Sequence, residues 1–208
     1  SKFSRWTFSS TKVRRFVPAN GNWNVSTNWN PIGIPTNADS AFIADGKFCT
    51  IINENAEVGS LNIEGTLTID DSETLHVAKN WIRTSGGATT SEFIPATGVV
   101  IFDGDNDQLI DATDFYLLRL SGSGVKTVTE GFSITKYITI DANVTFAGQT
   151  FDFIIGGNWL NNGTFTSSGA SKVIFNNANL AQTISSSQFN HIVFEGGGIK
   201  TATGNFDV

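Results

Sequence analysis

One acidic cluster has the residue types and spacing best suited to chemistry. The cluster comprises Asp103, Asp105, Asp107 and Asp114. Calcium takes roughly six to eight oxygen ligands, and clustered carboxylates supply them, so these residues form a candidate calcium site. Two features favour a solvated turn without any cofactor. Gln108 stands where a helix–loop–helix calcium loop needs glycine, and the corresponding later segment, 176–179, contains no acid.

A tryptophan pair and a basic segment near the start are candidates for binding. Trp23 and Trp29 either cap the end of the fold or offer their ring faces to a glycan. Residues 1–20 contain five Lys and Arg residues and no acid. Arg5, Arg14 and Arg15 in this segment are candidates for docking onto a partner. A capping strand, or contact with a membrane surface or nucleic acid, are the alternatives for the segment.

Catalytic motifs are lacking in the sequence. The two histidines, His76 and His191, fall in strand-like segments, and no Gly-x-Ser-x-Gly, phosphate-binding loop or zinc-ligand spacing is present. Glycosidases need two carboxyl groups about 5–9.5 Å apart, and no second motif points to such a pair. We therefore expect no catalytic residues and a protein that is not an enzyme.

An internal repeat indicates how these residues are positioned. Residues 79–82 (KNWI) recur as 157–160 (GNWL), 98–102 (GVVIF) as 171–175 (SKVIF), and 115–120 (FYLLRL) as 189–194 (FNHIVF). The offset settles at about 74 residues per unit, as between Gln108 and Gln182. Ordered matches at a nearly fixed offset are typical of a repeat architecture.

The elements within each unit are short strands. Segments such as 99–102 and 173–175 contain β-formers and end at Gly, Asn, Asp or Ser, and no long segment has helical periodicity. The sequence therefore predicts an all-β fold, a right-handed parallel β-helix (β-solenoid) with an N-terminal cap and about three coils of roughly 22–28 residues per unit. The expected parts are a basic-aromatic arm or cap strand (1–20), a capping segment with the paired Trp (21–52) and the repeats (53–208).

Composition narrows the possible partners. Five of the 13 Lys and Arg residues lie in the first 20 positions, which leaves eight against 19 Asp and Glu in the rest. This acidic body is not suited to nucleic acid. No apolar run reaches the roughly 18 residues of a membrane helix, so no transmembrane segment is expected. The lone cysteine, Cys49, lies in an apolar run and is expected to be buried.

The segment 20–52 carries a family resemblance. It combines Gly21, Trp23, Trp29, Pro31 and Pro35 in a pattern that resembles the opening of secreted β-helix proteins of Bacteroidota. The later Gly-Asn-Trp and Val-Ile-Phe motifs are similar to repeats of Bacteroidota surface proteins, so the resemblance covers about 20–208. Such proteins include giant adhesins exported by the type IX secretion system, some of them linked to gliding motility.

The resemblance implies a structural and adhesive segment of a large secreted cell-surface protein, acting as a rigid rod. Its implied partners are other segments of the same protein, cell-surface or secretion-machinery proteins, and polysaccharide surfaces. The alternative is a polysaccharide-binding or polysaccharide-cleaving β-helix of the pectate-lyase-like type. In that case Asp103, Asp105, Asp107 and Arg119 would be nominated for the site.

Overall fold

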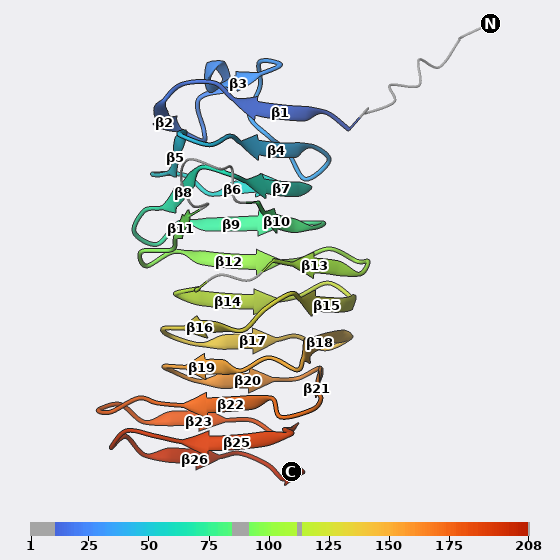
Figure 1. Cartoon of the computed structure of the whole chain (residues 1–208), viewed down its shortest axis with the longest axis vertical. Helices are drawn as coiled ribbons and strands as arrows, with labels where there is room; N and C mark the ends of the chain where they lie inside the picture. The colour runs from blue at the N-terminus through green and yellow to red at the C-terminus, as the bar shows by residue number, and fades with distance from the viewer. Residues whose placement is uncertain (1–10, 85–91, 112–113, 208) are drawn as a thin grey trace, which may run out of the picture.

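The protein is a β-solenoid in which parallel strands stack along one axis (Figure 1). The computed structural model describes residues 11–84, 92–111 and 114–207. Apart from one 3-10 turn, η1 (Ser26–Asn28), the regular elements of these residues are strands. All strand pairs among them are parallel except β1 with β3, which confirms the predicted all-β, parallel architecture.

Three faces enclose the core, and each face is built from strands of successive coils. Sheet A contains β1 (Val13–Phe16), β3 (Trp29–Asn30), β4 (Ser40–Ile43), β7 (Ser60–Ile63), β10 (Trp81–Arg83), β13 (Gln108–Ile110), β15 (Gly124–Val128), β18 (Val144–Gln149) and β21 (Thr164–Ser167). A short sheet E, with β24 (Ser187–Gln188) and β27 (Phe206–Asp207), follows it.

The second face consists of two four-stranded sheets. Sheet B contains β2 (Asn20–Asn22), β5 (Phe48–Ile51), β8 (Thr66–Ile69) and β11 (Glu92–Ile94). Sheet D contains β16 (Phe132–Ile134), β19 (Phe153–Ile155), β22 (Lys172–Phe175) and β25 (His191–Phe194).

Sheet C forms the third face, and its eight strands mark eight coils. They are β6 (Ala56–Val58), β9 (Thr74–Val77), β12 (Val99–Phe102), β14 (Leu117–Leu120), β17 (Ile138–Ile140), β20 (Trp159–Asn161), β23 (Gln182–Ile184) and β26 (Lys200–Ala202).

Many of the coils are shorter than the roughly 22–28 residues that the sequence led us to expect, and others fall within that range. Ala41 pairs with Leu61 and Leu61 pairs with Trp81, so the paired positions of successive coils lie about 20 residues apart. Longer steps occur at several places, as between Val13 and Ser40, Thr74 and Val99, Trp81 and Ile110, and Trp159 and Ile184. The physical reason for the short coils is that brief strands are joined by tight turns, so one circuit of three faces needs few residues.

Corresponding strands of the two repeat units lie on different faces. Trp81 (β10) and Gln108 (β13) belong to sheet A, whereas Trp159 (β20) and Gln182 (β23) belong to sheet C. Likewise β12 lies in sheet C and its counterpart β22 in sheet D. Each repeat is therefore one face short of four coils, which reconciles the long offset of the repeat with the short coils.

The core is a column of aliphatic and aromatic side chains. Inward positions alternate with outward ones along the strands, as in the buried Leu67 and Ile69 of β8. In the later coils the rings of Phe115, Phe132 and Phe153 follow one another edge to face at 5.3 and 5.0 Å between centroids. Such aromatic pairs stabilise a core by about 0.5–1.5 kcal/mol each beyond their burial.

Candidate functional site

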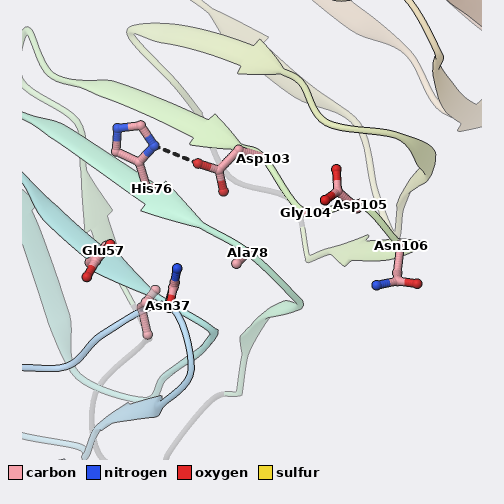
Figure 2. A pocket seen from close by; sticks show the side chains of 9 residues that line it. Asn37, Glu57, His76, Ala78, Asp103, Gly104, Asp105 and Asn106 are labelled. Carbon is pink, nitrogen blue, oxygen red and sulfur yellow. Dashed lines mark hydrogen bonds and ion pairs between the residues drawn. The ribbon is translucent and has the colours of Figure 1, made fainter.

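A hollow of about 410 Å³ lies on the outside of the early coils and contains the clearest group of titratable side chains (Figure 2). Its lining includes Asn37, Glu57, His76, Asp103, Asp105 and Asn106. Glu57 pairs in register with His76, and both are outward positions of sheet C. Asp103 follows β12 directly, and its Oδ2 lies 2.7 Å from His76 Nδ1. Neighbouring strands thus bring an imidazole and carboxylates together.

The four predicted calcium ligands do not converge. Asp107 Oδ1 accepts the Val125 amide at 2.8 Å, and Asp114 Oδ1 accepts the Ser133 amide at 2.8 Å, while Asp103 contacts His76. Over 11–84, 92–111 and 114–207, no group of three or more His, Cys, Asp or Glu side chains is arranged to hold a metal. Calcium binding at these residues stays a prediction.

Gln108 and Lys126 are buried beneath the acidic loop 103–107. We call the arrangement of these two side chains the first corner. Gln108 Oε1 accepts the Gly104 amide at 3.1 Å, and its Nε2 donates to the carbonyls of Val77, at 2.9 Å, and Lys79. Lys126 is 0 % exposed, and its Nζ donates to the Gly104 carbonyl at 2.7 Å and to the Ser123 carbonyl at 2.8 Å.

Lys126 is the group in this region with the most perturbed protonation. Burial lowers the pKa of Lys126 from its usual 10.5 to about 8, against the opposing attraction of Asp103, Asp105 and Asp107, which raises it. The negative loop thus helps to keep a buried ammonium charged. Sequence reasoning missed this role, although the recurrence of both residues as Gln182 and Lys200 was a usable signal.

The tryptophan pair lies in the core at the N-terminal end. Trp23 is 0 % exposed and Trp29 is 1 % exposed, and their rings meet edge to face at 4.8 Å. Trp29 Nε1 also donates to the Trp23 carbonyl at 2.8 Å. This placement agrees with the capping alternative and leaves no ring face of the pair for a glycan.

The three candidate docking arginines have different positions. Arg14 is buried, its Nε contacts Asp39 Oδ2 at 2.8 Å, and its Nη1 donates to the Pro31 and Ile32 carbonyls at 3.0 and 3.2 Å. Arg14 therefore holds the cap together and is not available for docking. Arg15 is exposed, with its guanidinium 4.8 Å from the centre of the Phe42 ring. Arg5 lies outside the described residues.

Hydrogen bonds keep the carboxyl group of Asp39, the partner of Arg14, in its ionised form. Burial of Asp39 opposes ionisation, but hydrogen bonds from Arg14, from the Lys12 amide and from Thr36 outweigh it and hold the pKa of Asp39 below its usual range. A buried charge pair of this kind is strongly destabilising to break, because the remaining charge is left without a partner.

No protein-family model, curated protein or solved structure matches this chain. The interpretation of the hollow therefore depends on its geometry. In the part of the chain that the structure describes, no helix is long and apolar enough to cross a membrane.

The hollow is suited to binding a polar ligand through hydrogen bonds. Asp103 contacts one imidazole nitrogen of His76 and so fixes the orientation of the ring. The other nitrogen, together with the exposed carboxylate of Glu57 on the adjacent strand, can contact hydroxyl or cationic groups. The arrangement provides a binding surface of mixed donors and acceptors.

Proposed function

We propose that this chain is a rigid, non-catalytic rod segment of a large secreted bacterial cell-surface protein, and that it presents adhesive surface away from the cell. The observation that carries the proposal is the long parallel stack, in which sheet C runs through eight strands. Each coil buries its apolar side on its neighbours, and such stacking gives an extended, stiff body.

Polar side chains along the coils support a structural role. Several Asn and Asp oxygens accept an amide of the next coil: Asn55 from Thr74, Asn80 from Leu109, Asp107 from Val125, Asp114 from Ser133, Asp152 from Lys172 and Asn158 from Thr183, each at 2.8 Å. These bonds satisfy backbone groups at the strand ends and tie successive coils together. Two of the four candidate carboxylates, Asp107 and Asp114, thus serve the stack.

The motifs of the first coils support the assignment to a class of protein. The Gly, Trp and Pro pattern of 21–35 resembles secreted Bacteroidota β-helix proteins, including adhesins exported by the type IX secretion system. We extend the proposal to that setting, with secretion to the cell surface, other segments of the same protein as neighbours, and a cell-surface or polysaccharide target.

The decisive experiment is to measure the native protein with an antibody raised against this chain. We expect an immunoblot of cells and culture medium to show a band far above 22.3 kDa, accessible to protease on intact cells. A released product close to 22.3 kDa that cleaves polysaccharide would contradict the proposal.

One observation favours a second candidate, a polysaccharide-binding β-helix. The hollow places His76, Glu57 and Asp103 on one open surface. Calorimetric titration with neutral and amino-sugar (cationic) oligosaccharides, comparing the wild-type chain with His76→Ala, tests this candidate. His191→Ala is the matched control because His191 is an exposed outward residue of sheet D. Binding lost in His76→Ala alone supports the candidate, and equal binding by both variants excludes this hollow.

A further inference from the structure

The outer surface of sheet D differs from the rest of its face. The register aligns Ser133, Ile154, Ile174 and Val193 in one outward row. The comparable row of sheet B is Asn22, Thr50, Thr68 and Ile94. Ile154 is 38 % exposed. Three consecutive coils thus present aliphatic side chains to solvent where the earlier coils present mostly polar ones.

A hollow borders this aliphatic row on each side. One, of about 680 Å³, is lined by Asp114, Asp152, Ile154 and Lys172 among others. The second, of about 460 Å³, lies between Ile154 and the turn at Asn176 and Asn177. The surface is therefore a ridge between two grooves, and its apolar crest is the part most available for contact with another protein surface.

Charges beside the ridge are segregated along the solenoid axis. Asp152, Lys172 and His191 follow one another on three successive strands, one residue before the aligned Phe153, Val173 and Ile192. All three are exposed. On the opposite side of the ridge, Lys136 lies two residues after the first strand of sheet D, and Glu195 directly follows the last strand. Reversing the strand order β16-β19-β22-β25 therefore exchanges an acidic position with a basic one on each side of the ridge. Asp152 exchanges with Lys172 on one side, and Lys136 with Glu195 on the other.

We infer that the outer surface of sheet D binds a second copy of this chain, with a two-fold axis parallel to the strands and between β19 and β22. A two-fold interface brings one surface patch against itself in reverse order. Asp152 then faces Lys172 of the second copy, and Lys172 faces Asp152. Ile154 packs against the second copy's Ile174, and Lys136 approaches its Glu195. In this arrangement each of these charged residues faces a residue of opposite charge from the same patch. We choose a second copy as the partner because of this self-complementarity.

The interface is small, so the association is expected to be weak. Four strands at about 4.8 Å each give a patch of roughly 19 Å along the axis. Stable complexes bury about 1,200–2,000 Å² in total, and this surface lies at or below the lower limit. We therefore expect a reversible dimer that forms at high micromolar concentration and weakens with added salt.

Sedimentation velocity over a concentration series tests the inference. The wild-type chain is expected to shift from monomer to dimer between about 10 µM and 1 mM. Ile154→Lys is expected to weaken the association about tenfold or more. The matched control is Ile82→Lys, since Ile82 is 37 % exposed on sheet A and lies outside the patch. This control is expected to dimerise like the wild type.

Charge-reversal variants test the proposed position of the two-fold axis between β19 and β22. Lys172→Glu places acid against acid, and Asp152→Lys places base against base, so each variant alone should be monomeric. Mixed together, they restore both attractive pairs and should form a heterodimer. Because Asp152 also accepts the Lys172 amide at 2.8 Å, circular dichroism of each variant must first show the wild-type fold. If Asp152→Lys is unfolded, Lys172→Glu and Ile154→Lys still decide the question. Monomeric wild type over the whole series, or single variants that dimerise like wild type, would overturn the inference.

Discussion

The molecule contains the same corner twice, once surrounded by acids and once by amides. In the second corner Gln182 Oε1 accepts the Asn177 amide at 3.0 Å, and its Nε2 donates to the Ile155 and Gly157 carbonyls at 2.8 and 2.6 Å. Gln108 makes the corresponding bonds in the first corner. The two corners lie on different faces, sheet A and sheet C, so the device depends on the turn and not on the face.

The lysines show where the corners differ. Lys200 Nζ donates to the Asn177 and Gly198 carbonyls, both at 2.9 Å, and is half-buried. Lys126 is fully buried beside Asp103, Asp105 and Asp107, whereas 176–179 carries no acid. The comparison teaches that the turn needs glutamine and an amine but not carboxylates. We infer that the acids accompany the deeper burial of the ammonium.

The largest effect is expected at the two glutamines, and it should be equal. Gln108→Leu and Gln182→Leu each leave one amide and one carbonyl without this partner and remove one of two donors from a second carbonyl. An orphaned buried polar group costs about 1–3 kcal/mol, so each variant should lose about 3 kcal/mol or more of unfolding free energy. Urea unfolding followed by circular dichroism measures this loss. Unequal losses would show that the glutamine hydrogen bonds do not stabilise the two corners to the same extent.

The lysine substitutions should separate the corners. Lys126→Met keeps the aliphatic volume but removes the donor to the Gly104 and Ser123 carbonyls inside the protein. We expect it to lose about 2 kcal/mol, and Lys200→Met, at a half-buried site, to lose under about 1 kcal/mol because water reaches its carbonyls. The same urea experiment measures both. Equal losses would mean that the difference in burial has no energetic consequence.

The fold could be predicted from the sequence, because strand-forming segments repeat and the apolar positions within them alternate. Where each segment lies in the stack could not be predicted in the same way. Three faces with similar apolar patterns accept the same segment, so the offset between Gln108 and Gln182 reveals neither the length of a coil nor the rotation by one face.

The candidate site was harder to predict for the same reason. The partner of Asp107 is an amide 18 residues further along, and that of Asp114 is 19 residues away. Arg14 was expected to face a partner, but it meets Asp39, 25 residues later. These pairings become visible only when the coil length is known. Local spacing of the acids suggested convergence on a metal, whereas the solenoid directs Asp107 and Asp114 toward the neighbouring coil.

The pH dependence of stability should carry the signature of Lys126. Its folded pKa of about 8 lies below its usual 10.5, so below pH 8 the folded state bears the full cost of a buried charge. As pH rises from 8 to 10.5 the folded lysine loses its proton before the unfolded one does, and stability increases. We expect a gain on the order of 1 kcal/mol between about pH 8 and 9.5. Lys126→Met should lack this gain and Lys200→Met should keep it, since other titrating groups are common to all three proteins. A wild type without the gain would contradict the lowered pKa.

The smallest effect should come from making the first corner resemble the second. Asp103→Asn, Asp105→Asn and Asp107→Asn together remove the charges that raise the pKa of Lys126, so the gain in stability should begin at a lower pH than in the wild type. Asparagine can still accept the Val125 amide through its side-chain oxygen, so the fold should persist.

The same triple variant, Asp103→Asn, Asp105→Asn and Asp107→Asn, also tests the calcium prediction. Because Asp103 and Asp107 already contact His76 and Val125, we expect millimolar calcium to change the melting temperature of the wild type and the variant by less than about 1 °C. A calcium-dependent rise in melting temperature of the wild type that the triple variant loses would instead establish a metal site in this loop. The three aspartates would then serve to bind calcium as well as to balance the charge of Lys126.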